Sequence, residues 1–146
     1  MLALLLAFAI GLAGCGGGSD TTEASTLTKA EYVKQADQIC AKTEGRQRAL
    51  LTKFQKENTK LGSGQAATEK MISFAALPPM EEQIQELSQL PPPSKEAAKA
   101  KAYVKELEKG LEIAEQEPGT LLITPGAFTK SEEAAQAFGF KTCAGA

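Results

Sequence analysis

Apolar residues recur every three or four positions along most of the chain beyond residue 27, which is the spacing of amphipathic helices. The first such stretch covers residues 29–59, and Thr28 and Glu31 at its start fit a capping box. Its apolar stripe consists of Val33, Ala36, Ile39, Cys40, Leu50, Leu51 and Phe54. The pattern predicts one long helix, with a soft point at Gly45 because glycine costs ~1 kcal/mol relative to alanine inside a helix.

Prolines divide the middle of the chain. Residues 66–77 and the segment that runs on to Leu90 both carry helical stripes, and Pro78 and Pro79 lie between them. Proline lacks an amide hydrogen and restricts the residue before it, so a continuous helix is interrupted here. Proline is compatible with the first turn of a helix, so the two pieces form either one kinked rod or two separate helices, and the kinked rod is favoured.

A fourth helix is expected after the run of three prolines at 91–93. Ser94 is a good N-cap for residues 95–117, and a regular apolar stripe runs through this segment. The stripe consists of Ala100, Tyr103, Val104, Leu107, Leu111 and Ala114. Residues 118–128 then predict an irregular or briefly extended connection.

The last helix is short. Thr129 and Glu132 fit a second capping box, and the apolar pattern runs to Phe138. Gly139 predicts a left-handed C-cap, with Phe140 folding back as its apolar partner.

The lengths of these segments suit antiparallel packing. At ~1.5 Å per residue the first helix spans about 46 Å, the kinked rod nearly 40 Å and the fourth segment about 35 Å. We therefore expect an all-α fold, an up-down bundle of three to five helices with a kinked middle rod. A disulfide is expected to join its first helix to the C-terminus, as the cysteines below indicate.

The N-terminal segment has a different pattern. An apolar run from Leu2 to Ile10 is followed by Leu12-Ala13-Gly14-Cys15, small residues placed before a cysteine. This arrangement resembles the lipobox of bacterial lipoprotein signal peptides. The resemblance implies cleavage after Gly14 and transfer of a diacylglyceryl group to the Cys15 thiol. The alternatives are an ordinary secretory signal and a short membrane helix, although the whole largely apolar stretch up to Ala13, about 13 residues, is shorter than the ~20 that span a bilayer.

The chain therefore divides into three parts. Residues 1–14 are expected to be a signal peptide, and residues 15–27 a lipidated cysteine followed by a flexible Gly/Ser/Thr-rich tether. Residues 28–146 are expected to form the helical bundle domain. We expect an extracytoplasmic protein anchored to the cell membrane through Cys15.

Two cysteines remain once Cys15 carries lipid. Disulfides persist outside the cytoplasm, so Cys40 and Cys143 are expected to form one structural bridge. Its loop of about 100 residues would contribute up to ~4–5 kcal/mol in the chain-entropy model. The alternative is a pair of free thiols with a redox or metal role, but neither lies in a Cys-x-x-Cys motif and the chain has no histidine.

The amino-acid composition restricts the catalytic groups, metal ligands and partners that the chain can have. The absence of histidine removes the commonest general base and transition-metal ligand, and no nucleophile–base pair is visible. The 16 basic and 18 acidic residues are nearly balanced, which gives no indication of a nucleic-acid partner. Residues 28–60 are basic and residues 61–90 are acidic, which suits two helices packed side by side.

Three candidate surfaces follow from the pattern. Lys101, Lys105 and Lys109 form a column that either contacts an anion or anionic lipid, or is a solvated face opposite acidic residues. The acidic residues considered for that pairing are Glu81, Glu82 and Glu86. A second column either holds a divalent cation or is solvated, and it consists of Glu108, Glu112 and Glu115. A third hypothesis places a binding groove at the kink around Pro78 and Pro79, where backbone groups lack helical partners.

Fragments of the mature part resemble small actinobacterial lipoproteins of no assigned function. The fragments are Ala36-Asp37-Gln38-Ile39-Cys40-Ala41, Leu90-Pro91-Pro92-Pro93 and Phe138-Gly139-Phe140-Lys141-Thr142-Cys143. The resemblance implies a helical fold and the Cys40–Cys143 bridge, and it implies no activity.

Taken together, these features predict a membrane-anchored lipoprotein that is not an enzyme and needs no cofactor. Its expected partner is an envelope protein or a small ligand, with the membrane itself contacted through Cys15. The alternative is a carboxylate-based metal-binding protein or enzyme of the cell envelope.

Overall fold

The computed structural model describes residues 27–60, 62–122 and 126–145. Within these ranges the chain forms five α-helices and one 3₁₀-helix, and no strand. In chain order the elements are α1 (Lys29–Glu57), α2 (Gln65–Ala75), α3 (Leu77–Gln89), α4 (Ala97–Gln116), η1 (Pro118–Leu122) and α5 (Thr129–Phe138). The predicted all-α fold is confirmed. The predicted signal peptide and the tether up to residue 26 lie outside the described residues.

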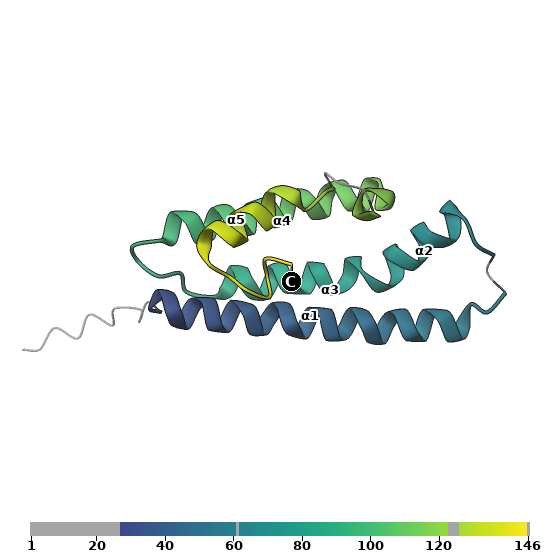
Figure 1. The fold of residues 1–146 in the computed structure, drawn as a ribbon, viewed down its shortest axis with the longest axis horizontal. Coiled ribbons are helices and arrows are strands. Elements are labelled where there is room, and N and C mark those ends of the chain that lie inside the picture. The colour runs from purple at the N-terminus through teal and green to yellow at the C-terminus, as the bar shows by residue number, and fades with distance from the viewer. Residues whose placement is uncertain (1–26, 61, 123–125, 146) are drawn as a thin grey trace, which may run out of the picture.

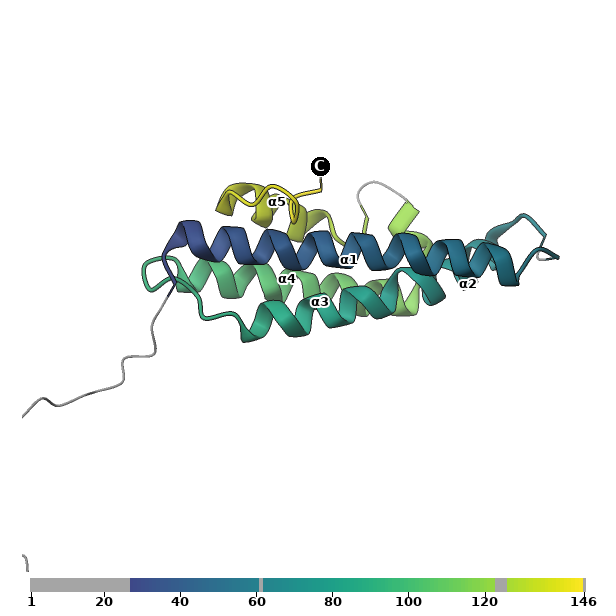
Figure 2. The ribbon, with the colours of Figure 1, turned by 90° about the horizontal axis from the view of Figure 1, so that it is seen from below.

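The long helices run alternately up and down (Figures 1 and 2). Helix α3 packs against both α1 and α4, and α5 returns along α4. Helix α2 lies against the last part of α1 and against η1. We call the end where α1 begins the near end, and the end that holds α2 and η1 the far end.

The start of α1 follows from its local sequence. The Thr28 side chain accepts from the Glu31 N–H at 3.3 Å, and the Glu31 carboxylate accepts from the Thr28 N–H at 2.9 Å. The predicted capping box is therefore confirmed. The helix continues through Gly45 without interruption and ends at Glu57, two residues before the predicted end.

The kink in the middle rod lies at Ala76, as the prolines predict. Helix α2 ends at Ala75 and α3 begins at Leu77, with Pro78 and Pro79 in its first turn. Proline fits a first turn because the amide it lacks has no helical acceptor there. The bend directs α3 into the middle of the bundle and leaves α2 at the far end (Figure 1).

Two predicted caps are wrong. Helix α4 begins at Ala97 with Glu96 as N-cap, because residues 94–96 first form a turn in which the Glu96 N–H donates to the Pro93 carbonyl at 3.0 Å. Ser94 therefore precedes the helix and is not its N-cap.

Helix α5 begins at Thr129 itself, with Phe128 as N-cap and no side-chain capping bond. The Thr129 hydroxyl accepts from the Gly126 N–H at 2.8 Å, and Ser131 donates to the Phe128 carbonyl at 2.8 Å. Burial of Phe128 against α4 sets the start of this helix, and the hydroxyls bind the preceding turn. The connection before it contains η1, which the sequence did not predict.

Gly110 allows the start of α5 to pack closely against α4. A Cβ atom at this position would lie 2.6 Å from the Phe128 ring and 2.8 Å from the Ala127 carbonyl oxygen. No side chain larger than hydrogen fits between these groups without a shift of the backbone. The glycine therefore allows the chain that enters α5 to approach the α4 backbone closely.

The end of α5 is a Schellman motif. Gly139 adopts φ +101°, its N–H donates to the Gln136 carbonyl, and the Phe140 N–H donates to the Ala135 carbonyl, both at 3.1 Å. The predicted left-handed cap is confirmed, and Phe140 is buried.

One apolar cluster forms the core of the bundle, and it begins at the near end. Its buried members are Tyr32, Ala36, Ile84, Leu87, Ala100, Tyr103, Val104, Leu107, Ala114, Phe128, Ala135, Phe138 and Phe140. The rings of Phe138 and Phe140 stack at 4.6 Å between centroids, and Tyr103 meets Phe140 at 4.9 Å. In α2, Ile72 and Ala75 are buried outside this cluster.

Ion pairs join the basic helix to the acidic rod, as the charge distribution predicts. Lys42 of α1 pairs with Glu86 of α3 at 2.5 Å, and Arg46 pairs with Glu82 one turn further along. These side chains are largely exposed, so each pair contributes only ~0–1 kcal/mol to stability.

Candidate functional site

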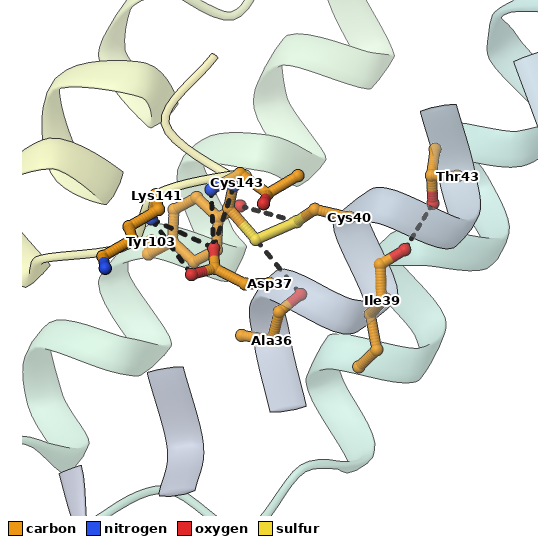
Figure 3. Close-up of a disulfide and its surroundings, with 9 residues drawn as sticks. Ala36, Asp37, Ile39, Cys40, Thr43, Tyr103, Lys141 and Cys143 are labelled. Atoms are coloured by element: carbon orange, nitrogen blue, oxygen red, sulfur yellow. Dashed lines mark hydrogen bonds between the residues drawn. A yellow bond between two sulfur atoms is a disulfide. The ribbon is translucent and has the colours of Figure 1, made fainter. Parts of the chain in front are cut away.

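The predicted disulfide is present. Cys40 of α1 and Cys143 near the C-terminus are bonded, with Cα atoms 5.3 Å apart across 103 positions of sequence (Figure 3). The Cys143 Sγ packs 3.2 Å from the Ala36 carbonyl oxygen. The bond closes the bundle by tying its last residues to its first helix, and it leaves no free thiol at either position.

A carboxylate supports the same junction. Asp37 accepts hydrogen bonds from three successive backbone N–H groups, those of Lys141, Thr142 and Cys143, at 2.9–3.1 Å (Figure 3). Asp37 precedes Cys40 by three residues and so shares its helix face. No role was predicted for Asp37 from the sequence, although this spacing is a signal that points to it.

Tyr103 lies beneath the disulfide. Its hydroxyl is 3.9 Å from the Cys40 Sγ, and as the disulfide sulfur carries no hydrogen the tyrosine is the donor. Burial raises the pKa of Tyr103, and the nearby Tyr32 and Asp37 raise it further. The hydroxyl therefore stays protonated. These groups form a structural junction and offer no nucleophile.

A groove between α3 and α4, which we call the α3–α4 groove, is a candidate binding site. Its volume is about 300 Å³, at the low end for small-molecule sites. Tyr32, Leu87 and Ala100 are each about 1% exposed and form its floor. The remaining lining residues are Ser88, Leu90, Pro92, Lys101, Val104, Lys105 and Glu108.

The structure separates the three lysines of the predicted basic column. Lys101 and Lys105 line the α3–α4 groove, whereas Lys109 pairs with Glu106 at 2.6 Å. That bond lowers the pKa of Glu106, with smaller contributions from neighbouring lysines. The suggested pairing of the column with acidic residues of α3 is wrong for Glu82 and Glu86, because both pair with α1.

The acidic column does not gather into a metal site. Glu108, Glu112 and Glu115 are exposed, and Glu108 turns out to line the α3–α4 groove. Among the residues that the structure describes, no group of three or more histidine, cysteine, aspartate or glutamate side chains is arranged to hold a metal ion.

The suggested site at the kink takes a different form from the one predicted. The Ala76 carbonyl accepts from the Met80 N–H and from the Gln47 side chain, both at 3.3 Å, and Pro79 is buried. The backbone at Ala76 is therefore paired. Beside it, between α1 and α2, lies a second groove with a mostly apolar lining, which we call the α1–α2 groove. It is lined by Glu44, Gln47, Arg48, Leu51, Met71, Ile72, Ala75 and Ala76.

The α3–α4 groove was not predicted from the sequence. Lys101 and Lys105 were singled out as members of a basic column, and nothing in the pattern connected Tyr32 or Leu87 with them. Only the packing of α1, α3 and α4 places these apolar residues beside the lysines. Cys15, the predicted lipidation site, lies outside the described residues.

None of the helices that the structure describes has the length and apolarity of a membrane-spanning segment. Comparison with known proteins gives no match: no family model, no curated protein and no solved structure is significantly similar to this chain.

Proposed function

We propose that the protein is an extracytoplasmic module that is held at the membrane by a lipid on Cys15 and acts by binding a ligand in the α3–α4 groove. The observation that carries the binding role is the groove itself. Its floor is apolar, and charged groups stand on one side only, along α4. This combination of an apolar cavity with a few placed polar groups is typical of small-molecule sites.

The proposed location rests on the N-terminal pattern. The apolar run and the Leu12–Cys15 motif favour lipidation, and the Cys40–Cys143 disulfide is the type of bond that persists outside the cytoplasm. The described part begins at Leu27, at the near end. A tether of residues 16–26 has a typical span of ~17–20 Å, so the near end would stay close to the bilayer.

Mass spectrometry of the protein purified from its own membrane tests the anchor. We expect a chain that begins at Cys15 and carries acyl groups. Retention of residues 1–14, or a Cys15 without fatty acid, would contradict the proposed anchoring.

Native mass spectrometry of the same preparation tests the groove. We expect a non-covalent ligand on the wild-type protein that is lost in Ser88→Phe, because the exposed Ser88 side chain lines the groove and a phenyl ring would fill it. Gln85→Phe is the matched control, since Gln85 is exposed on the same helix outside the groove. An adduct that is absent from the wild type, or equal in all three proteins, would contradict the binding role.

A further inference from the structure

The α3–α4 groove has two chemically distinct parts. The apolar part is formed by three helices: Tyr32 from α1, Leu87 from α3, and Ala100 and Val104 from α4. These four side chains are almost fully buried, so an alkyl chain in the groove would also contact Leu90 and Pro92, which are half-buried and line it. A methylene group that is removed from water there improves affinity by up to about fourfold.

The second part is cationic. Lys101 and Lys105 stand one turn apart on α4, so their ammonium groups share one face of the helix. Neither forms an ion pair with any residue in the described ranges. Among the lysines of the described residues, ion pairs involve Lys29, Lys42 and Lys109 alone, so the place of Lys101 and Lys105 at the groove is what sets these two apart.

One acidic residue also lines the groove. Glu108 follows Lys105 by three residues and so lies about one turn further along α4. Two positive charges and one negative charge leave the groove with a net charge of +1. The two lysines therefore favour an anionic group of the ligand next to them. Glu108 disfavours an anionic group at its own end of the groove.

We propose that the ligand of this groove is a single-chain amphiphile with an anionic head, a free fatty carboxylate. The alkyl chain lies on the apolar floor, and the carboxylate accepts from the ammonium groups of Lys101 and Lys105. A volume of about 300 Å³ suits one chain better than the two chains of a bilayer phospholipid. This proposal rests on the proposed function, since it names the ligand class of the same groove.

The test uses the full chain reconstituted into phosphatidylcholine nanodiscs. Decanoate and decyltrimethylammonium have equal chains and opposite head charges, and acetate represents the head alone. Shifts of the backbone amide resonances of Val104 and Lys105 report occupancy of the groove. We expect saturable shifts with decanoate, at least tenfold weaker binding of decyltrimethylammonium, and no shift with acetate.

Variants sharpen the test of the head group. Replacement of both lysines, Lys101→Gln with Lys105→Gln, is expected to weaken decanoate binding about fivefold to tenfold. Glu108→Gln is expected to tighten it about twofold to threefold, since it removes the only negative charge among the lining residues. Lys99→Gln is the control, because Lys99 is exposed on α4 and does not line the groove.

Several outcomes would overturn the inference. Equal affinity for the two decyl ligands, or lysine variants that bind decanoate as the wild type does, would remove the role of the charge. Groove shifts caused by phosphatidylglycerol in the nanodisc without added decanoate would identify a membrane lipid as the ligand instead. A ligand that is lost in Ser88→Phe but proves neutral or cationic would leave the proposed function standing and refute this inference alone.

Discussion

The near and far ends of the bundle are stabilised in different ways. At the near end the rings of Tyr32, Tyr103, Phe138 and Phe140 are each at most 5% exposed, and the disulfide ties α1 to the C-terminus beside them. Among the described residues of the far end, the rings of Phe54 and Phe74 form one aromatic pair, in which Phe74 is 36% exposed, and Leu122 is 63% exposed.

The difference shows where the stability of this small domain is concentrated. Covalent closure, aromatic packing and the Asp37 hydrogen bonds all act on the same half of the molecule. Helix α2 lies outside the main cluster and contributes the buried side chains of Ile72 and Ala75. Elements with few buried contacts open at lower free energy than the core, so the far end is expected to open first.

The largest expected effect is loss of the disulfide. Cys40→Ser is expected to lower the free energy of unfolding by about 4–5 kcal/mol, because the bond closes a loop of about 100 residues. Denaturant titration with and without a reductant measures it. The reductant should destabilise the wild type and leave the variant unchanged; equal titration curves for the wild type in both conditions would contradict the prediction.

The aromatic cluster gives a direct comparison of the two ends. Phe140→Ala is expected to cost about 3–5 kcal/mol, because it leaves a cavity among packed rings. Phe74→Ala, the matched change at the far end, should cost about 1 kcal/mol or less, because that ring is already partly in water. Urea unfolding of both variants measures the difference. Similar costs would mean that the two ends are equally well packed.

Alanine substitutions at two helical glycines distinguish the effect of packing on stability from the effect of helix propensity. Gly110→Ala is expected to destabilise the protein by about 1–3 kcal/mol, since its methyl group would clash with the Ala127 carbonyl and the Phe128 ring. Gly45→Ala has open space around it and should stabilise by about 0.5–1 kcal/mol. Thermal unfolding of the two variants checks the opposite signs, and equal shifts in one direction would refute the packing argument.

The capping box at the near end predicts a pH dependence. Hydrogen bonds from the Thr28 side chain and backbone lower the pKa of Glu31 below 4.5. A lowered folded-state pKa means that the ionised group stabilises the fold above pH 4.5, and this contribution disappears as the pH falls through the folded pKa. Helix α2, by contrast, begins after Gly64 with no side-chain cap.

Glu31→Gln tests this smallest effect. The variant is expected to lose less stability than the wild type between about pH 6 and about pH 3, as measured by urea unfolding across that range. Thr28→Ala should cost about 1 kcal/mol at neutral pH. Parallel pH profiles for the wild type and Glu31→Gln would show that the box is not coupled to stability.

Features that depend on a few neighbouring residues were predicted well. The Thr28 cap, the kink before Pro78 and the Gly139 turn each arise within about one helical turn of the residues that cause them. The Ser94 and Thr129 caps failed for the opposite reason. At these positions the preceding turn and the burial of Phe128 set the helix start, and neither can be seen in the capping pattern alone.

By itself, the sequence determined the helical segments, the bend between α2 and α3, and the pairing of a basic helix with an acidic rod, because periodicity, proline and net charge act locally or additively. The tertiary structure alone decided that Gly110 admits α5, that Asp37 binds the C-terminal backbone, and that Lys101 and Lys105 border an apolar groove. The physical reason is that these contacts join helices distant in sequence, and their geometry is set by how side chains of different helices fill shared space.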